Sequence, residues 1–431
     1  MSFLIYNILL LVSAVFLIPF FALKIVLAGK YRKSIGPKFG LIPQRVFDEM
    51  KGSPRIWVHA VSVGEVTAAA PIISSLRGMY PEACIVLSTS TETGQEMAGR
   101  LITDTSALIY YPLDIPVVVR KVIERVNPDI FVPVETEIWP NFIRACAKRG
   151  TRIVMVNGRI SPRSFRRYRR TRFFWKRIMN MLDMMGAISA IDASRLEALG
   201  VEPSRIHVLG NAKYDSLAAG ADDALRDEME ARLDIPHEAR VFVAGSTHEG
   251  EDGMVLKVYR GLLEKYPDML MVIVPRHPER GDDIVSLARD EGFDDCVTMK
   301  EINSGTKRAG RRIVIVDVIG ELFKVYSLAT MVFCGGSLVP RGGQNILEPA
   351  AWGKVVLYGP SMDDFMDEKE RLGMAGGGIT VSNDRELLAE TLKLMEDPET
   401  LRRKGAAGRE IVASNGGAAR RYAEMIRTHL K

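Results

Sequence analysis

The alternation of apolar and polar positions predicts short strands separated by longer helices through most of the chain. Several of the expected strands are apolar throughout, as strands buried on both faces of a sheet are. A polar turn and a helical pattern follow each strand of the first half, which is typical of parallel α/β construction. We expect strands at residues 55–60, 83–88, 130–134, 152–156, 241–244, 270–274, 312–316, 331–334 and 355–357.

The length of the chain favours more than one domain. Its 431 residues suggest two α/β domains after an N-terminal segment, since one domain takes roughly 150 residues. Between the two groups of strands, an irregular passage at 201–215 precedes a charged helix at 221–232. We expect an N-terminal domain at 29–220 and a C-terminal domain at 221–431, with the helical segment 385–430 packing across both. Doubly wound sheets bind ligands at the carboxyl ends of their strands, so two such sheets facing each other would share a central cleft.

The N-terminal segment is the most apolar part of the chain. Residues 3–23 carry no charged side chain, and crossing a hydrocarbon core takes ~20 residues. The basic cluster at 30–33 follows this run, and such a flank stays on the cytoplasmic side of a membrane. A cleaved signal peptide would carry its basic residues before the run, and a buried core helix is rarely apolar on every face. We predict that residues 1–28 are a single-pass transmembrane anchor and that the rest is cytoplasmic.

The remaining composition is that of an ordinary globular protein. The chain is 47% hydrophobic and 26% charged, with a net charge of +5, which fits a substantial core and a mild overall field. The cysteines are widely separated and form no C-x-x-C pair, so we expect reduced thiols and no zinc site. They are Cys84, Cys146, Cys296 and Cys334. No G-x-x-x-x-G-K-[ST] loop occurs, so nucleotide hydrolysis is not indicated.

Carboxylates follow two of the first-half strands. Glu65 comes after Gly64, near the start of the helix that follows the first soluble strand. It is either a catalytic carboxylate or a complement to the helix dipole, which is worth ~0.3–1 kcal/mol. Glu135 and Glu137 end another strand in an apolar passage, where unpaired carboxylates are costly. A solvated loop is the alternative there.

A basic stretch interleaved with aromatic residues extends over 163–177. Guanidinium groups bind phosphates and aromatic rings enter a headgroup layer, so the stretch suits an anionic lipid surface. RNA offers the same chemistry, but an anchored protein favours the lipid. A solvated helix face with core aromatics remains the alternative interpretation.

In the second half, polar groups and glycines follow the expected strands. Arg276 comes directly after an apolar strand and has paired donors for a phosphate. The glycines at 335–336 permit close approach of a ligand. The segment 341–350 opens a helix whose first N–H groups suit a phosphate, and Glu348 there has a carboxylate for the hydroxyls of a ribose. Together these features predict a nucleotide site.

Taken together, the motifs resemble those of the 3-deoxy-D-manno-octulosonic acid (Kdo) transferase family. The resemblance covers nearly the whole chain and implies an inverting glycosyltransferase of the B fold at the cell inner membrane. It implies transfer of Kdo from CMP-Kdo to a lipid A precursor, lipid IVA, in lipopolysaccharide core biosynthesis, with release of CMP. Two residues depart from the family's pattern: Gln344 stands where His is expected, and Val318 stands where Thr is expected. The motifs are HAVSVGE, ETEIWPN, NGRISPRSF, GNAKYD, AGSTHEGE, VPRHPER, IGEL and GGSLVPRGGQNILEPA.

The resemblance also implies a role for individual residues. Glu65 matches the general base, and Glu135 and Lys213 match groups that stabilise the transition state. An inverting transfer needs one carboxylate to deprotonate the acceptor and positive groups to stabilise the departing phosphate. The absence of a clustered Asp-x-Asp motif suits a mechanism without metal or other cofactor. The residues matching the CMP-binding segments are Pro275, Arg276, Ile319, Gly320, Glu321, Asn345, Ile346, Leu347 and Glu348.

Two other functions are compatible with parts of this pattern. One is a membrane-associated transferase of the same fold that uses a UDP-sugar and releases UDP. The other is a noncatalytic protein that binds anionic lipid or RNA through residues 163–177. A noncatalytic binding protein would leave the nucleotide-site motifs unexplained. We therefore expect CMP-Kdo, a lipid A precursor and an anionic membrane surface as partners, and no nucleic acid.

Overall fold

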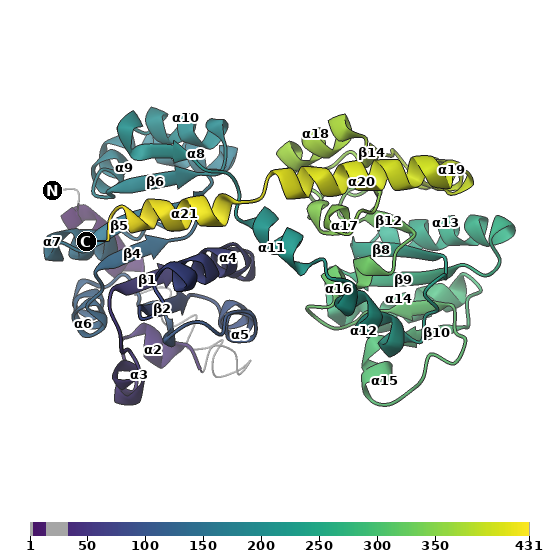
Figure 1. Ribbon diagram of the computed structural model, residues 1–431, viewed down its shortest axis with the longest axis horizontal. Helices are drawn as coiled ribbons and strands as arrows, with labels where there is room; N and C mark the ends of the chain where they lie inside the picture. The colour runs from purple at the N-terminus through teal and green to yellow at the C-terminus, as the bar shows by residue number, and fades with distance from the viewer. Residues whose placement is uncertain (1–2, 14–32, 431) are drawn as a thin grey trace. The chain divides into compact units, whose positions relative to one another are not determined.

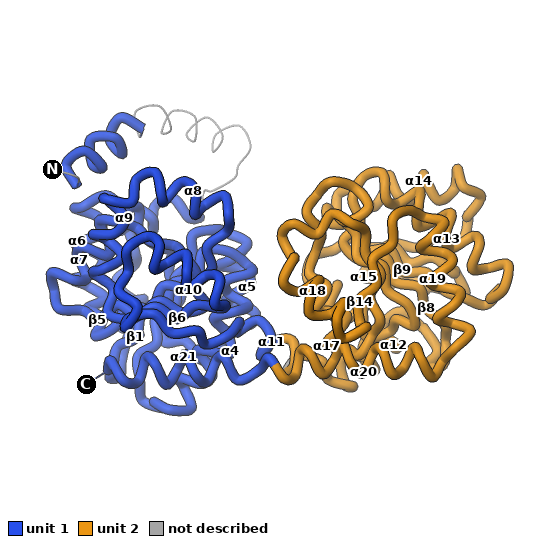
Figure 2. The backbone as a smooth tube through the Cα atoms, turned by 90° about the horizontal axis from the view of Figure 1, so that it is seen from above, with its two compact units in different colours: residues 1–216, 415–431 blue, residues 217–414 orange. Residues whose placement is uncertain are grey.

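The computed structural model describes residues 3–13 and 33–430 of the chain. They form two compact units, coloured separately in Figure 2. Unit 1 comprises Met1–Ser216 and Asn415–Lys431, and unit 2 comprises Leu217–Ser414. Each unit is built on its own seven-stranded sheet in which every described pairing is parallel.

The sheet of unit 1 has the strand order β3-β2-β1-β4-β5-β6-β7. The order reverses between β1 and β4, and such a switch point is where doubly wound sheets bind ligands. The strands are β1 (Arg55–His59), β2 (Cys84–Thr89), β3 (Ala107–Tyr110), β4 (Ile130–Pro133), β5 (Arg152–Gly158), β6 (Met184–Ala187) and β7 (Ile206–Val208).

Helices cover both faces of this sheet (Figure 1). Local sequence explains where several of them start and stop: Thr91 and Ser189 accept an N-terminal N–H through their side chains, and Gly150 ends a helix in the left-handed region. They are α2 (Ile35–Lys38), α3 (Gln44–Asp48), α4 (Val63–Met79), α5 (Glu92–Leu101), α6 (Pro116–Val126), α7 (Pro140–Arg149), α8 (Pro162–Arg170), α9 (Arg172–Met179), α10 (Ala190–Ala198), α11 (Lys213–Gly220), which runs on into unit 2, and α21 (Ala418–Arg427).

The sheet of unit 2 has the order β10-β11-β9-β8-β12-β13-β14. Its inner strands are fully buried and apolar at most positions, so the sheet is covered on both faces. The strands are β8 (Val241–Thr247), β9 (Leu270–Pro275), β10 (Cys296–Thr298), β11 (Ile313–Ile315), β12 (Met331–Cys334), β13 (Val356–Tyr358) and β14 (Gly378–Thr380).

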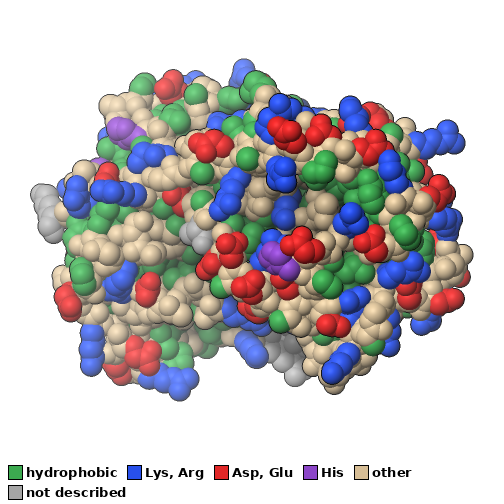
Figure 3. Space-filling view, turned by 45° about the vertical axis from the view of Figure 1, so that its right-hand side comes forward, with side chains coloured by type: hydrophobic (Ala, Val, Ile, Leu, Met, Phe, Trp, Pro, Cys, Tyr) green, Lys and Arg blue, Asp and Glu red, His purple; other side chains and the backbone are tan. Residues whose placement is uncertain are grey.

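The helices of unit 2 again alternate with the strands. Thr298 and Glu301 form a reciprocal capping box at the start of one short helix. The helices are α12 (Asp223–Leu233), α13 (Glu251–Lys265), α14 (Gly281–Asp290), α15 (Met299–Asn303), α16 (Leu322–Ser327), α17 (Leu347–Ala351), α18 (Met366–Ala375), α19 (Asp384–Glu396) and α20 (Pro398–Ser414). Acidic and basic side chains are interspersed over the face in Figure 3, consistent with the mild net charge.

The last helix corrects the predicted domain division. After α20 the chain returns to unit 1, where α21 packs against α4 and β5. Tyr422 is fully buried there and donates a hydrogen bond to the carbonyl of Gly210 at 2.7 Å. A Cβ at Gly186 would lie 2.4 Å from the Tyr422 ring, so only glycine fits beneath it. The second compact unit is therefore Leu217–Ser414 rather than 221–431, because the apolar face of α21 is buried in unit 1.

The first residues of the predicted anchor also contact unit 1. Residues 3–13 are helical, and Phe3 is buried beside Phe174 with the ring centroids 6.0 Å apart. Tyr6 donates to Asp114 at 2.8 Å. Residues 14–28 of the predicted anchor lie outside the described part of the chain. Among the residues that the structure describes, no helix combines the length and apolar character needed to cross a membrane.

Candidate active site

Glu65 lies where the chain leaves β1 and enters α4. It occupies the first turn of α4 and is only 7% exposed. One carboxylate oxygen accepts the Val61 N–H at 2.8 Å, and the other accepts the Ser62 hydroxyl at 3.2 Å. The carboxylate therefore makes local contacts of the kind expected from a structural role, and these contacts also fix its position.

The surroundings of Glu65 make it a strong base. Burial, together with the negative charges of Glu135 and Glu137, raises the pKa of Glu65 to about 8. The hydrogen bonds from Val61 and Ser62 act in the opposite direction. A carboxylate with a pKa near the working pH accepts a proton far better than an ordinary one. Such a shift beside other acids is typical of functional sites.

Glu135 is held in an unusual backbone conformation. It follows β4, has a φ of +59° and donates its N–H to the Val156 carbonyl at 2.9 Å. A residue other than glycine is uncommon in this region, and such conformations cluster at functional sites. Its carboxylate pairs with the Lys213 ammonium at 2.9 Å. Burial and the neighbouring Glu135 charge raise the pKa of Glu137.

Lys213, the ion-pair partner of Glu135, also reaches the start of α4. The Asn157 side chain accepts the Ala212 N–H at 2.9 Å, and the Asn211 side chain accepts the Lys213 N–H at 3.0 Å. A Cβ added at Gly64 would lie 3.7 Å from the Lys213 nitrogen, so the ammonium reaches the first turn of α4. Unit 1 thus brings the three predicted catalytic residues, Glu65, Glu135 and Lys213, together.

The basic and aromatic stretch of residues 163–177 forms α8 and α9. Most of its aromatic side chains are partly buried and pack against the core of unit 1, whereas its arginines point into solvent. Phe173 is the exception at 78% exposed. A solvated basic face over core aromatics therefore describes this region.

In unit 2, three neighbouring strands bring the second-half motifs together. β8 lies between β9 and β12, so the residues after these strands meet at one edge of the sheet. Arg276 donates its main-chain N–H to the Thr247 carbonyl at 3.0 Å, and Gly335 donates to the Gly245 carbonyl at 2.8 Å.

Glu251 organises this edge, although sequence reasoning did not single it out as a site residue. Its buried carboxylate accepts the N–H groups of His248 at 2.9 Å, Gly336 at 2.6 Å, Ser337 at 3.0 Å and Leu338 at 2.9 Å. The N–H groups of residues 336–338 are therefore occupied by protein. The glycine loop supports the site, while a ligand would have to be bound by side chains around it.

Glu348 and Arg276 lie close enough to interact. The pKa of Glu348 is raised to about 7, because the effect of burial exceeds the lowering by the Asn345 hydrogen bond and by the positive charge of Arg276. The helix predicted to open within 341–350 is α17, which begins only at Leu347 and has five residues. Its Leu347 N–H donates to the Asn345 side chain at 3.2 Å.

The predicted turn at Ile319, Gly320 and Glu321 follows β11, which neighbours β9. Ile319 is 73% exposed and Gly320 has a φ of +95°, which favours glycine. Glu321 forms an ion pair with Arg232 at 3.0 Å. All three predicted nucleotide segments therefore lie in unit 2, after strands of one sheet.

One group of side chains has the spacing of a metal site. Ligand atoms of Asp227, Glu230 and His237 lie within 4.8 Å of one another. The Glu230 carboxylate already contacts Arg226 at 2.7 Å and His237 at 3.0 Å. A metal ion there would be repelled by the positive charge of the Arg226 guanidinium, so this group is a poor metal site. A mechanism without metal stays a prediction.

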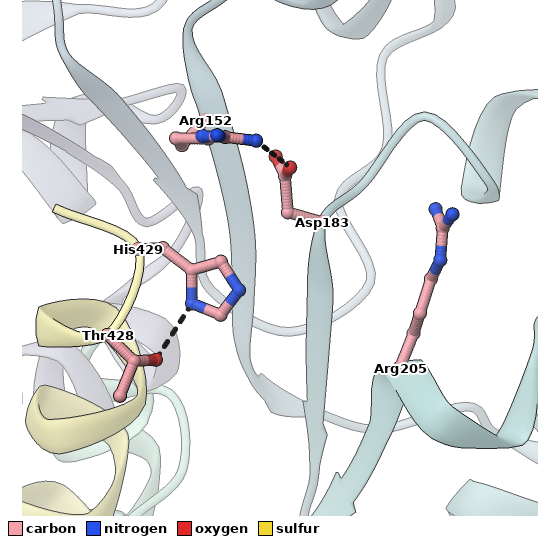
Figure 4. Close-up of a pocket in the computed structure, with 5 residues that line it drawn as sticks. All are labelled: Arg152, Asp183, Arg205, Thr428 and His429. Carbon is pink, nitrogen blue, oxygen red and sulfur yellow. Dashed lines mark hydrogen bonds and ion pairs between the residues drawn. The ribbon is translucent and has the colours of Figure 1, made fainter. Parts of the chain in front are cut away.

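The pocket in Figure 4 is lined by none of the predicted site residues. It has a volume of about 270 Å³ and is lined by Arg152, Asp183, Arg205, Thr428 and His429. Arg152 begins β5, so the pocket is at the amino edge of the sheet, opposite the carboxyl edge. Arg152 pairs with Asp183 at 2.9 Å, and Arg205 donates to the Asn180 carbonyl at 3.0 Å.

Comparison with known proteins assigns the family. Residues 33–216 match the family described as 3-Deoxy-D-manno-octulosonic-acid transferase (kdotransferase). The 3-deoxy-D-manno-octulosonic acid transferase of Haemophilus influenzae is 31% identical over 427 residues, covering 99% of this chain and 98% of that protein. That of Chlamydophila psittaci is 30% identical over 374 residues, covering 86% of this chain and 83% of that protein.

Among solved structures, a UDP-N-acetylglucosamine 2-epimerase has a TM-score of 0.63 at 15% identity. It covers 88% of this chain and 96% of its own, so the likeness concerns the fold alone. The fold is that of glycosyltransferase-B-like proteins with two parallel-sheet domains. Together with the sequence match over nearly the full length of both proteins, this means that the chain belongs to the 3-deoxy-D-manno-octulosonic acid transferase family of glycosyltransferases.

Proposed function

We propose that the protein transfers Kdo from CMP-Kdo to a hydroxyl of a lipid A precursor such as lipid IVA, with inversion at the anomeric carbon. Unit 1 binds the acceptor and unit 2 binds the donor. The observation that carries the proposal is the buried Glu65 carboxylate, fixed by Val61 and Ser62 beside the Glu135–Lys213 pair.

In the proposed step, Glu65 removes the proton of the acceptor hydroxyl as its oxygen bonds to the anomeric carbon of Kdo. The bond from that carbon to the phosphate oxygen breaks, and its electron pair leaves with CMP. Attack opposite the leaving group inverts the configuration. Lys213 compensates negative charge that develops on the acceptor oxygen, and Glu135 holds the ammonium in position.

Donor binding by unit 2 is supported by the groups at its sheet edge. The Arg276 guanidinium suits the phosphate of CMP. The Glu348 carboxylate, held by Asn345 at 3.1 Å, suits the ribose hydroxyls. The segments 319–321 and 345–348 complete the proposed nucleotide site, which needs no metal or other cofactor.

We also propose that the protein acts at the inner membrane, with both units cytoplasmic and residues 1–28 as the anchor. The side chains of residues 3–13 that face away from unit 1 are apolar and exposed, including Leu4 at 65% and Leu9 at 60%. A pocket of about 470 Å³ beside this helix is lined by the cations Arg120, Arg144, Lys148 and Arg149. Apolar side chains next to cations suit an anionic membrane surface.

The direct test is mass spectrometry of lipid IVA after incubation with CMP-Kdo and the purified full-length protein. We expect discrete mass steps, one for each Kdo added, together with release of CMP. An unmodified acceptor, or sugar transfer only from a UDP-sugar with release of UDP, would contradict the proposal.

The CMP assignment has its own expected result. Arg276→Ala and Glu348→Ala should each weaken CMP binding about ten- to hundredfold, because each removes a charged hydrogen bond worth ~1.5–3 kcal/mol. Titration calorimetry on the full chain measures this. The exposed Arg240, which pairs with Asp268 at 3.0 Å, provides the control Arg240→Ala. Normal CMP binding by both site variants would contradict the assignment.

We expect the basic face of α8 to contribute to binding of the acceptor or of the membrane. Replacing Arg166, Arg167, Arg169 and Arg170 with Gln should raise the acceptor KM or weaken membrane association, because exposed guanidinium groups bind lipid phosphates. The affinity for CMP should change little, since these residues belong to unit 1. A collapse of CMP affinity with normal use of the acceptor would overturn this division between the units.

A further inference from the structure

Two polar side-chain atoms at the end of β8 are buried without a hydrogen-bond partner among the described residues. They are the hydroxyl oxygen of Thr247, which is 0% exposed as a residue, and Nε2 of His248. Buried polar atoms of native proteins are normally hydrogen-bonded. Both atoms lie at the carboxyl edge of the unit 2 sheet, beside the proposed nucleotide residues.

The His248 ring is held firmly in place. Its main-chain N–H donates to Glu251 at 2.9 Å, and its ring is perpendicular to that of His277 with the centroids 5.9 Å apart. A Cβ at Gly336 would lie 3.1 Å from Cδ2 and 3.3 Å from Nε2 of His248. The imidazole therefore packs over the glycine loop, in a space that a side chain at 336 would occupy.

Two arginines lie near enough to this imidazole for their charges to act on it. Arg276 follows β9 and Arg341 follows β12, and the charges of both act on His248. Both side chains are exposed, and neither forms an ion pair with a described residue. Burial, more than the cations, lowers the pKa of His248, so its neutral ring carries a single N–H. Glu251, whose negative charge also acts on the ring, is already bound by four main-chain N–H groups.

Two guanidinium groups without an ion-pair partner, at the same sheet edge as one neutral imidazole, match a ligand with two neighbouring anions. The proposed donor is such a ligand, because in CMP-Kdo the anomeric carbon bears both the phosphate ester and the sugar carboxylate. A nucleoside monophosphate of a neutral sugar has only its phosphate as an anion and would leave one arginine without a partner.

We propose that His248 and Arg341 bind the carboxylate of the donor's sugar while Arg276 binds its phosphate, so that this edge of unit 2 selects a CMP-linked sugar acid over a CMP-linked neutral sugar. The inference rests on the proposed donor and adds residues that recognise its sugar. His248 donates one N–H to the carboxylate, and Arg341 provides the opposite charge.

The test compares CMP with CMP-Kdo and with a CMP-Kdo analogue whose carboxylate is an uncharged amide. Binding is measured by calorimetry on the full chain carrying Glu65→Gln, so that no donor is consumed. His248→Phe keeps the shape of the ring without its N–H, and Arg341→Gln removes the charge. Arg289→Gln, an exposed arginine of α14, is the matched control.

We expect each site variant to bind CMP within about threefold of the parent and to lose about ten- to hundredfold in affinity for CMP-Kdo, the range for a charged hydrogen bond. The preference of the parent for carboxylate over amide should shrink by the same factor. Normal CMP binding also shows that the variant is folded. If CMP and CMP-Kdo weaken equally, the residues bind phosphate and the inference is wrong.

Unchanged CMP-Kdo binding would also overturn the inference, since His248 would then only support the loop. If His248→Phe no longer binds CMP at all, it is compared with His248→Gln, which keeps an N–H donor. Rescue of CMP-Kdo binding by glutamine supports the proposal, and failure of both variants contradicts it. A parent protein that binds neither CMP nor CMP-Kdo would instead reject the proposed function itself.

Discussion

Replacing Glu65 with glutamine is expected to lower the rate of Kdo transfer by ~10²–10⁴-fold, the usual contribution of a general base. The amide oxygen of glutamine can still accept the Val61 N–H, which Glu65 now accepts at 2.8 Å. The loop into α4 should therefore persist, and CMP binding should be normal. Initial rates and CMP titrations on the same variant measure the two properties separately.

The pH dependence gives an independent check on Glu65. Its pKa is raised to about 8, and only the ionised form accepts a proton. The transfer rate of the wild type should therefore rise with pH and level off above about 8. The glutamine variant should lose this rise. A flat wild-type profile between pH 6 and 9 would remove Glu65 as the base, and Glu137 would be the next candidate.

A purely structural Glu65 predicts a different outcome. Loss of a helix-capping carboxylate costs ~1 kcal/mol or less, with turnover near normal. Because the pKa of Glu65 is raised, its ionised carboxylate at high pH is expected to lower the stability of the fold rather than to increase it. Any stability that Glu65 contributes is complete below its unfolded pKa of 4.5 and is lost as the pH rises through about 8. At pH 9 the glutamine variant should melt no lower than the wild type. Asp223→Asn, an exposed first-turn acid of α12, is the control.

The sequence predicted the inner strands of both sheets and missed the outer ones. All nine expected strands are present, and they form β1, β2, β4 and β5 of unit 1 and β8, β9, β11, β12 and β13 of unit 2. The strands that escaped prediction, β3, β6, β7, β10 and β14, lie at the outer positions of the two sheets. An inner strand is buried on both faces and reads as an apolar run, whereas a short outer strand mixes exposed and small residues. His207 and Val208 of β7, for example, are exposed.

The same reasoning explains what could be predicted of the candidate site. Carboxylates and arginines that follow apolar strands stand out in sequence, and Glu65, Glu135 and Arg276 were found in this way. The role of Lys213 came from resemblance alone, because its ion pair with Glu135 joins residues 78 positions apart. Glu251 gave no local signal, since its four hydrogen bonds go mostly to a loop that is distant in sequence. The packing of His248 against Gly336 likewise depends on the order of the strands.

Replacing Lys213 with methionine is expected to lower kcat by about 10²–10³-fold, the scale seen when one group that stabilises a transition state is removed. The ammonium contacts Glu135 at 2.9 Å and reaches the first turn of α4, next to Glu65. Its loss removes the only cation paired with these carboxylates in the described residues. CMP affinity should be unchanged, since the proposed nucleotide residues belong to unit 2. Arg226→Gln, which breaks an ion pair of similar exposure at 2.7 Å, is the control.

The pH profiles of two partner variants decide whether Lys213 acts in the reaction or only pairs with Glu135. The Glu135 charge raises the pKa of Glu65, so Glu135→Gln should shift the rate profile to lower pH. Lys213→Met leaves that charge uncompensated and should shift the profile to higher pH, in addition to lowering its plateau. If the pair were only structural, removing both partners together would leave neither charge unpaired and would restore turnover. We expect the double variant Glu135→Gln/Lys213→Met to stay as slow as Lys213→Met at every pH, because the ammonium itself is needed where the acceptor oxygen becomes negative.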